Sequence, residues 1–460
     1  DGIVDLLICD EGHRLKSGNA STTKRLDAMK CKRRILLTGT PLQNNLNEFW
    51  WCLSFVQPGL LPPQATFDRV FKKHIERSQD ASASGTEVAI GRARSAELAQ
   101  LAAGVLLRRG PELLETLLPP RTELLLSVPL TAPQAVTYLA LCVEVKKKIS
   151  TAGCDFRTHL GILGLLRQLC NIDPEELCSS KLGPDQMIDE SVTVDGSIGG
   201  ATPQATDDTS RSLYRRIFSN LGLTARLPSE AGALNSSKFL LLRELLSWCS
   251  KHAPNDGIVI VSGYRRTLDC CTQLCNELKI PSSILTGSTA VNTRLDMVNK
   301  FNRGKACRAF LLASRAGGVG LNIVGANRLI MMEPDWNPAV DLQAMGRIWR
   351  QGQEKACYIY RLAALGTLEE KVLKRQVRKQ GLASVAFQDA GQTNNTDNLC
   401  DLSELRKVFT LEGYSDGGAP VRRARTDWDA PALAATGLLH PAIKDSLFDV
   451  KILDDTTQRE

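Results

Sequence analysis

Apolar and polar residues alternate in blocks along two stretches of the chain, and these blocks predict an α/β fold. Short continuous apolar runs separated by helical periodicity are typical of parallel strands with both faces covered. One such stretch covers residues 1–57 and the second covers 256–365. The predicted strands are 6–9, 34–37, 258–262, 283–285, 309–312, 329–332 and 358–362, and the predicted helices are 47–55, 133–149, 238–249, 267–278, 293–301 and 369–379.

The segments outside these two bodies have a different pattern. Proline and glycine at 58, 59, 62 and 63 interrupt the first body, and helical stretches follow. Residues 191–210 carry almost no large apolar side chains, so we expect a disordered loop there. The predicted division is 1–57 for the front body, 58–118 for a helical protrusion, 119–235 for a linker with a second helical insertion and the disordered loop, 236–387 for the rear body, and 388–460 for a tail with a short helix at 402–409.

Composition narrows the class of protein only a little. The 460 residues carry a net charge of +7, which is compatible with a polyanionic partner. No apolar run is long enough to cross a bilayer, and we expect neither a secretory leader nor a membrane partner. The 14 cysteines lack paired C-x-x-C spacing, which favours buried thiols in a reducing cytosolic or nuclear compartment over zinc sites or disulfides.

Two charged motifs at opposite ends of the chain predict a phosphate site. Asp10 and Glu11 follow the apolar run 6–9, where carboxylates can hold Mg²⁺ through water and orient an attacking water. Arg347 and Arg350 are three residues apart, a spacing that places both guanidiniums on one face of a helix. Guanidinium groups suit a phosphate whose charge grows during transfer. The alternative for the carboxylates is a charged strand cap.

Small polar residues at several strand ends predict contacts with a nucleic-acid backbone. Ser262, the pair Gly287–Ser288, and Ser314 with Gly317 each follow a predicted strand, and such turns suit sugar–phosphate contacts without base reading. Each turn alone could equally be an ordinary polar turn. Trp336, just past another strand, could stack on a base or lie in the core.

In their order along the chain, these motifs resemble those of the Swi/Snf-type ATPases of helicase superfamily two. The resemblance rests on 10–13, 38–45, 314–322, 335–338 and 343–353, and it covers nearly the whole chain. Within that family, the chain is most similar to the homologous-recombination repair translocases. That narrower resemblance rests on 325–330, 357–362, 366–371, 402–411 and 427–429.

The resemblance implies two RecA-like lobes that bind ATP and Mg²⁺ between them and move on double-stranded DNA. It implies a nuclear protein with a RecA-like recombinase as partner and chromatin as a further one. Asp10 and Glu11 would handle the metal and the hydrolytic water, Arg347 and Arg350 would act as arginine fingers, and Gln343 and Gly320 would serve the nucleotide. The DNA contacts would be Ser262, Gly287, Ser288, Ser314, Gly317 and Trp336.

The largest departure from the family pattern is the phosphate-binding loop. The chain has no Gly-x-x-x-x-Gly-Lys-Ser/Thr sequence, and it begins with Asp1 directly before a predicted strand. We expect that loop to precede Asp1 in the full-length protein, and this chain alone to be inactive as an ATPase. The alternative is a catalytically incomplete module that binds DNA or a partner.

Overall fold

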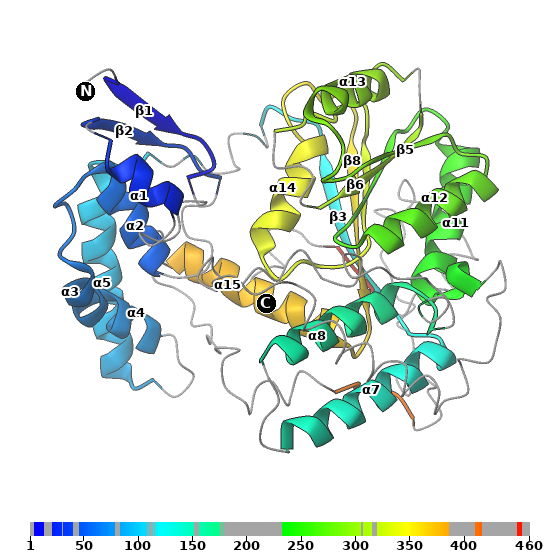
Figure 1. Cartoon of the computed structure of the whole chain (residues 1–460), viewed down its shortest axis with the longest axis horizontal. Helices are drawn as coiled ribbons and strands as arrows, with labels where there is room; N and C mark the ends of the chain where they lie inside the picture. Colours follow the sequence, from blue (N-terminus) through cyan, green and yellow to red (C-terminus); the bar gives the residue numbers. More distant parts are fainter. Residues whose placement is uncertain are drawn as a thin grey trace.

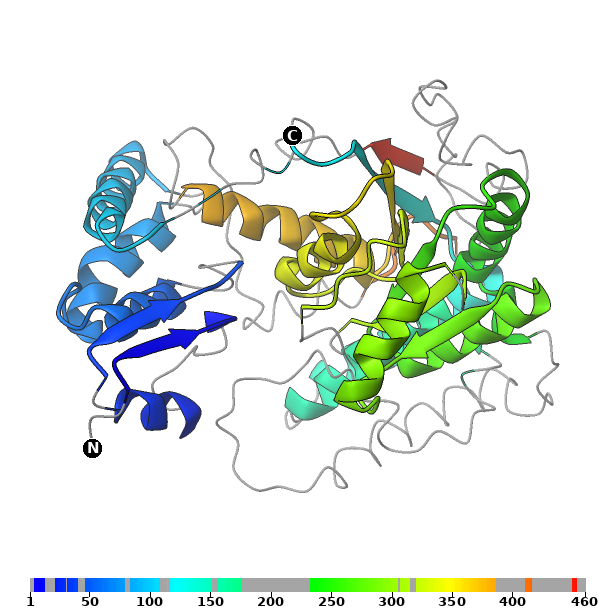
Figure 2. The same cartoon turned by 90° about the horizontal axis from the view of Figure 1, so that it is seen from above.

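The computed structural model describes residues 4–12, 21–29, 31–39, 46–78, 83–107, 109, 114, 116–150, 156–174, 177, 232–304, 307–314, 320–385, 410–415 and 449–452. These residues form a front body at the N-terminal side and a larger rear body, and helix α15 (Leu368–Val385) extends from the rear body toward the front one (Figures 1 and 2). The predicted disordered loop at 191–210 and the short helix at 402–409 lie outside the described residues.

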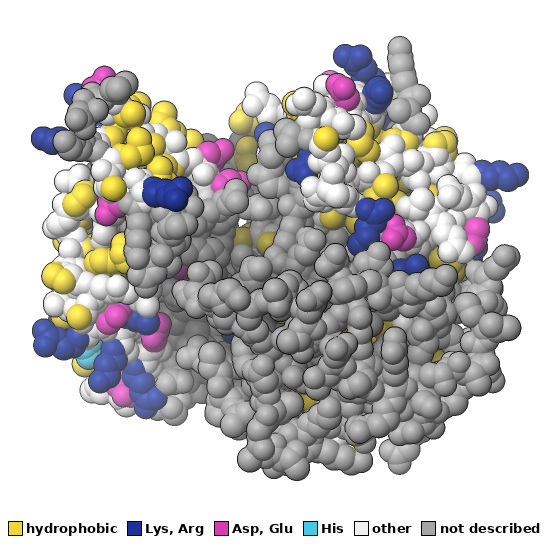
Figure 3. Space-filling view, viewed as in Figure 1, with side chains coloured by type: hydrophobic (Ala, Val, Ile, Leu, Met, Phe, Trp, Pro, Cys, Tyr) yellow, Lys and Arg dark blue, Asp and Glu magenta, His cyan; other side chains and the backbone are white. Residues whose placement is uncertain are grey.

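The front body contains a parallel two-stranded sheet, as the sequence predicts. Strands β1 (Leu6–Cys9) and β2 (Arg33–Leu36) pair with Ile8 opposite Ile35, and the short helix α1 (Ser21–Asp27) lies between them in the chain. One face of this sheet is apolar and exposed, with Leu6 at 46% and Ile8 at 56% exposure. Figure 3 shows hydrophobic side chains gathered over this end of the molecule.

A small separate core joins helices of the predicted protrusion (58–118) to the helix at 46–56, which the sequence places in the front body (1–57). Aromatic side chains at Phe49, Phe67 and Phe71 pack with Leu98 in one buried cluster. The last helix begins with a capping box in which Ser84 accepts from the Glu87 amide while Glu87 accepts from the Ser84 amide. Its elements are α2 (Leu46–Val56), α3 (Gln64–Phe67), a π-helical turn (Asp68–Lys72), α4 (Lys73–Arg77) and α5 (Gly85–Ala103).

A seven-stranded sheet forms the centre of the rear body, with the order β5-β6-β4-β7-β8-β3-β9. Among the described residues, every strand pair of this sheet is parallel except β3 with β9. The α/β class with parallel sheets is therefore confirmed. The strands are β3 (Arg121–Val128), β4 (Ile258–Ser262), β5 (Ser282–Leu285), β6 (Ala309–Ala313), β7 (Arg328–Met331), β8 (Cys357–Ala364) and β9 (Asp449–Ile452).

Both faces of this sheet are buried, which explains the continuous apolar runs in the sequence. Along β4, Ile258 and Ile260 enter one core, whereas Val259 and Val261 enter the other. The first core also contains residues of α7 (Ala132–Ser150), α8 (Phe156–Asn171), α11 (Ser237–His252) and α12 (Arg265–Glu277), and the second contains residues of α13 (Val291–Asn302) and α14 (Pro338–Ile348). The three cysteines of α12 are free and buried, as predicted.

The rear body is larger in sequence than the predicted interval 236–387. Strand β3 comes from the segment expected to be a linker, and β9 comes from the expected tail, yet both belong to the same sheet as β8. Helix α8 likewise packs in the core of the rear body. The residues at 124–129 predict an extended segment, but its pairing with a strand more than two hundred residues away could not be deduced from them.

A second piece of the tail is fixed to the rear body. Residues 410–415, which we call the strap, contact the turn between β8 and α15 and the end of β3. The Glu412 amide donates to the Gly366 carbonyl at 3.0 Å, and the Tyr414 hydroxyl accepts from the Leu130 amide at 2.7 Å. Gly366 has a φ of +69°, and a Cβ there would lie 2.0 Å from the Glu412 carbonyl oxygen. Glycine at 366 is therefore required for the strap to dock.

Candidate functional site

Asp10 and Glu11 form a tight turn at the carboxyl end of β1. The Glu11 amide donates to Asp10 Oδ1 at 2.8 Å, and Glu11 has a φ of +50°, in the left-handed region. The Gly12 amide then donates to the Leu37 carbonyl at 2.8 Å. A Cβ on Gly12 would lie 1.3 Å from Leu36 Cδ2, so any other residue there would require the Leu36 side chain to move. The turn thus presents two carboxylates beyond the sheet edge.

The two arginines lie at the end of α14. This helix begins at Pro338, where Asn337 Oδ1 caps the Ala339 amide at 3.1 Å. It ends at Ile348, so Arg347 is in its last turn and Arg350 lies beyond it. The predicted placement of both guanidiniums on one helical face is therefore wrong. Burial lowers the pKa of Arg347, and the charge of Arg350 lowers it further, so the two guanidiniums are within electrostatic range of each other.

Carboxylate and guanidinium groups from the two bodies come within electrostatic range of each other. Burial and the charge of Arg350 lower the pKa of Arg347, and the Glu11 carboxylate opposes them. The carboxyl end of β1 faces the side of the rear body that carries α14 (Figures 1 and 2). Groups 336 residues apart in the sequence therefore share one region between the two bodies.

The donor set at this region fits a hard cation and a phosphate. Mg²⁺ prefers oxygen ligands and usually keeps several waters, so two carboxylates suffice to hold it. Among the described residues, no group of three or more His, Cys, Asp or Glu side chains could hold a metal. Gln343 lies half-buried one turn before Arg347 on α14, and Gly320 is exposed. Gly317 lies outside the described residues.

The turn after β5 is held in a fixed conformation with its tip exposed. Arg294 donates through Nε to the Thr289 carbonyl at 2.8 Å and through its terminal nitrogen to the Gly287 carbonyl at 2.7 Å. The Thr286 and Ser288 hydroxyls are 2.9 Å apart. Gly287 and Ser288 are both exposed. The contact of Gly287 and Ser288 with a polymer backbone stays a prediction, and their exposure leaves room for it.

Ser262 is placed differently from the other serines. Its side chain is 1% exposed, and its hydroxyl donates to Glu333 Oε1 at 2.8 Å. The Gly263 amide donates to the same oxygen at 2.5 Å. In this structure the donors at the end of β4 are thus used by an internal carboxylate. Ser314 is half-buried beside this turn, and its amide donates to the Ser262 carbonyl at 3.0 Å.

Trp349 and Trp336 differ in how deeply they are buried. Trp349 is 6% exposed and belongs to a buried core cluster, and its Nε1 donates to the Pro119 carbonyl at 2.9 Å. Trp336 is half-buried against the core of the rear body, and the Arg167 guanidinium lies 5.9 Å from its ring centroid. Its position is therefore intermediate between the two alternatives that the sequence left open.

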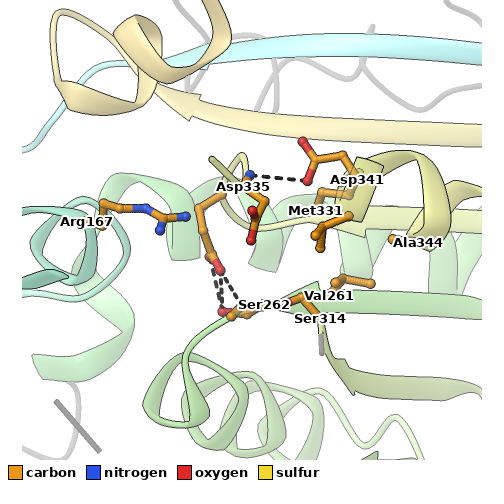
Figure 4. Close-up of a pocket in the computed structure, with 11 residues that line it drawn as sticks. Arg167, Val261, Ser262, Ser314, Met331, Asp335, Asp341 and Ala344 are labelled. Atoms are coloured by element: carbon orange, nitrogen blue, oxygen red, sulfur yellow. Dashed lines mark hydrogen bonds between the residues drawn. The ribbon is translucent and has the colours of Figure 1, made fainter. Parts of the chain in front are cut away.

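A pocket opens at the carboxyl ends of β4, β6 and β7, beside these turns (Figure 4). It is lined by Arg167, Val261, Ser262, Gly263, Ser314, Met331, Glu333, Asp335, Val340, Asp341 and Ala344. Burial raises the pKa of Glu333, although the charges of Arg167 and Lys238 oppose this effect. Three carboxylates in its wall make the pocket unsuitable for an anion. Its side chains mainly bond to one another and to the loops around them.

Sequence reasoning missed a network of buried charges behind this pocket. Lys238 Nζ donates to both oxygens of Glu369, at 2.8 and 2.7 Å, and both side chains are 0% exposed. A second cluster joins Arg361 to Glu123 at 3.0 Å and to Asp341 at 3.1 Å. The only sequence signal was a lysine beside the apolar run of residues 239–242, which is also compatible with a solvated helix end.

Comparison with known proteins covers both bodies. The SNF2-related domain model matches residues 3–175, and the helicase conserved C-terminal domain model matches 237–352. The chain is 38% identical to DNA repair and recombination protein RAD54 of Oryza sativa subsp. japonica, covering 89% of this chain and 40% of that protein. It is 36% identical to RAD54B of Gallus gallus, with 89% and 43% covered. The chain therefore spans less than half the length of these curated relatives.

Solved structures also match over much of the chain. The C-terminal part of the Fun30 ATPase domain matches with 21% identity and a TM-score of 0.43, covering 64% of this chain and 97% of that one. The Sulfolobus solfataricus SWI2/SNF2 ATPase core in complex with dsDNA matches with 22% identity and a TM-score of 0.42, covering 88% and 73%. Among the described residues, none of the helices has the length and apolar character needed to cross a membrane.

Proposed function

The chain belongs to the SNF2-related family, and we propose that it forms the larger part of an ATP-dependent motor on double-stranded DNA. The motor would act in homologous-recombination repair and in DNA or chromatin remodelling, in the nucleus. The single observation that carries this proposal is the shared region of Glu11 from the front body and Arg347 from the rear body. The names of the relatives, which are DNA repair and recombination proteins, support the process.

The residues of this chain would divide the work at the nucleotide. Mg²⁺ bound to ATP would supply charge neutralisation on the phosphates. Asp10 and Glu11, fixed beyond β1 by Gly12, would hold the metal through water and orient the attacking water. Arg347 and Arg350 would stabilise the charge that develops on the transferred phosphoryl group, and they can reach it only when the two bodies are close.

Closure and opening of the two bodies would move the strand-end turns along the DNA backbone. Gly287 and Ser288 would contact phosphates from the exposed turn after β5, and Ser314, Gly317 and Trp336 would make further contacts with the DNA. Contacts of this kind carry no base information, so binding would be tolerant of sequence and weakened by salt. A RecA-like recombinase would be the protein partner, since the named relatives are recombination proteins.

The alternative is a DNA- or partner-binding module without ATP turnover. Both proposals predict DNA binding, so only hydrolysis separates them. Family matches on both bodies support the motor over the module, because the front match includes the carboxylates and the rear match includes both arginines.

The test is ATP hydrolysis by the full-length protein with and without double-stranded DNA. We expect DNA to stimulate hydrolysis, and Arg350→Ala to lower the stimulated kcat by about a thousandfold or more, as for other arginine fingers. Arg243→Ala is the matched control, because Arg243 on α11 forms an exposed ion pair with Glu277 on α12. Hydrolysis by Arg350→Ala at the parental rate would refute the assigned role, and a parent without DNA-stimulated hydrolysis would favour the module.

A further inference from the structure

Helix α8 carries two buried polar residues that reach both loops at the DNA-facing edge of the rear sheet. Arg167 and Asn171 are four residues apart, a spacing that places them on one face of the helix. Arg167 is 2% exposed and Asn171 is 0% exposed. Polar side chains buried so deeply are normally retained only with specific partners.

Asn171 joins a buried ammonium group to a buried carboxylate. Its Nδ2 donates to Glu333 Oε2 at 2.7 Å, and its Oδ1 accepts from Lys238 Nζ at 2.9 Å. A side-chain amide is both donor and acceptor, which an aspartate or a leucine at this position could not match. Glu333 in turn accepts from the Gly263 amide at 2.5 Å. Asn171 therefore fixes the turn after β4 through Glu333.

Arg167 contacts the second loop. Its terminal nitrogen donates to the Pro334 carbonyl at 2.7 Å. The guanidinium also lies 5.4 Å from the ring centroid of Tyr264, in the first loop, and 5.9 Å from that of Trp336, in the second. In Figure 4, Arg167 points from α8 toward the pocket between these loops. One side chain thus spans the distance between the ends of β4 and β7.

We propose that Arg167 and Asn171 are positioning residues that fix the loops 262–264 and 333–336 and thereby set Trp336 for contact with DNA. The inference rests on the proposed function, and it adds a helix outside the two sheets to the DNA-binding apparatus. Neither residue can touch a phosphate itself, because both are buried. They act through Glu333, Pro334 and the ring of Trp336.

The geometry also favours fixed positioning over a gate. Glu333 accepts hydrogen bonds from three residues, and Arg167 and Lys238 provide positive charge beside it. Releasing such a carboxylate in every cycle would leave several buried donors without an acceptor. We therefore assign the cluster a constant role, in which the loops keep one conformation whether or not DNA is bound.

The test measures the affinity of the protein for a fluorescently labelled DNA duplex over a series of salt concentrations. The main variant is Arg167→Lys, which keeps the positive charge near Glu333 but loses the planar group over Tyr264 and Trp336. We expect affinity to fall about fivefold, the slope of log affinity against log salt to stay parental, and the melting temperature to stay close to that of the parent. Arg243→Lys on α11 is the matched control and should bind as the parent does.

Asn171→Ala provides the second measurement and should weaken binding in the same way. If this variant fails to fold, Arg167→Lys decides alone. Parental affinity in Arg167→Lys would overturn the inference while leaving the proposed function intact. A salt slope smaller by about 0.9 would also overturn it, because that change marks the loss of a direct phosphate contact. A parent that does not bind the duplex would remove both the inference and the proposed function.

Discussion

The buried pair of Lys238 and Glu369 offers the sharpest test of how the rear body is held together. Lys238 stands near the start of α11 and Glu369 near the start of α15, and both are fully buried. Lys238 also donates to the Met332 carbonyl at 2.6 Å and to Asn171. Glu369 also accepts from the Ala364 amide at 2.7 Å. The pair thus joins two helices to the ends of β7 and β8.

Lys238→Met should remove the ammonium group and leave the Glu369 carboxylate buried without its counter-charge. Breaking a buried pair from one side costs about 3–5 kcal/mol. For a body of this size, each kcal/mol corresponds to a shift of about 2–4 °C in Tm. We therefore expect the melting temperature to fall by roughly 6–20 °C. The double variant Lys238→Met with Glu369→Gln should recover most of this loss, because no uncompensated charge remains and Gln can still accept from the Ala364 amide.

Thermal unfolding followed by far-UV circular dichroism measures the effect, with unfolding in urea as a second probe. Arg243→Met is the matched control, because its partner Glu277 is only partly buried. Loss of such a pair near the surface should cost less than about 1 kcal/mol. The reasoning is refuted if Lys238→Met is as mild as Arg243→Met. It is also refuted if the double variant is no more stable than the single one, since the cost would then not come from the buried charge.

Two further predictions concern the same body. Burial raises the pKa of Asp341 to about 6, despite the opposing charge of Arg361. Between about pH 4 and about pH 6 the folded chain therefore holds a proton that the unfolded chain has lost, and stability falls as pH rises, by about 1.4 kcal/mol per pH unit. In urea unfolding, the free energy of unfolding of Asp341→Asn should thus rise relative to that of the parent as pH increases across this window. A difference between the two proteins that does not change with pH would contradict the raised pKa of Asp341. Gly366→Ala should lower Tm more than Gly304→Ala, because both have positive φ but only Gly366 meets the strap. Equal losses would show that the strap moves aside without cost.

The sequence predicted the strands well because their physical signal is local. Val259 and Val261 alternate with Ile258 and Ile260, and burial on both faces of the sheet requires the apolar side chains that make such runs visible. The nucleotide motifs were visible for the same reason, since each is contiguous in the chain. That Glu11 and Arg347 serve one nucleotide site stays a prediction, which the effect of the Glu11 charge on the pKa of Arg347 supports.

Other features could not be predicted, because their causes are not local. Helix α14 ends before Arg350 because the chain turns at Trp349, whose Nε1 bonds to the distant Pro119 carbonyl. Lys238 looks like an ordinary solvated lysine until its carboxylate partner, 131 residues later, is placed beside it. Ser262 reads as an exposed hydroxyl until Glu333 is known to accept from it. Each case depends on a tertiary partner that no pattern in the sequence identifies.

The strands of the rear sheet come from three separate parts of the chain, and this affects how the protein folds while it is being synthesised. Strand β3 is synthesised more than two hundred residues before its neighbour β8, and β9 follows close to the last residues of this chain. Contacts between such distant segments form slowly, since a long loop must close first. Until β8 arrives, the apolar side chains of β3 would be exposed to other chains, which makes the nascent protein a client for chaperones. A fragment that begins at residue 236 would lack β3 and expose the edge of β8 permanently.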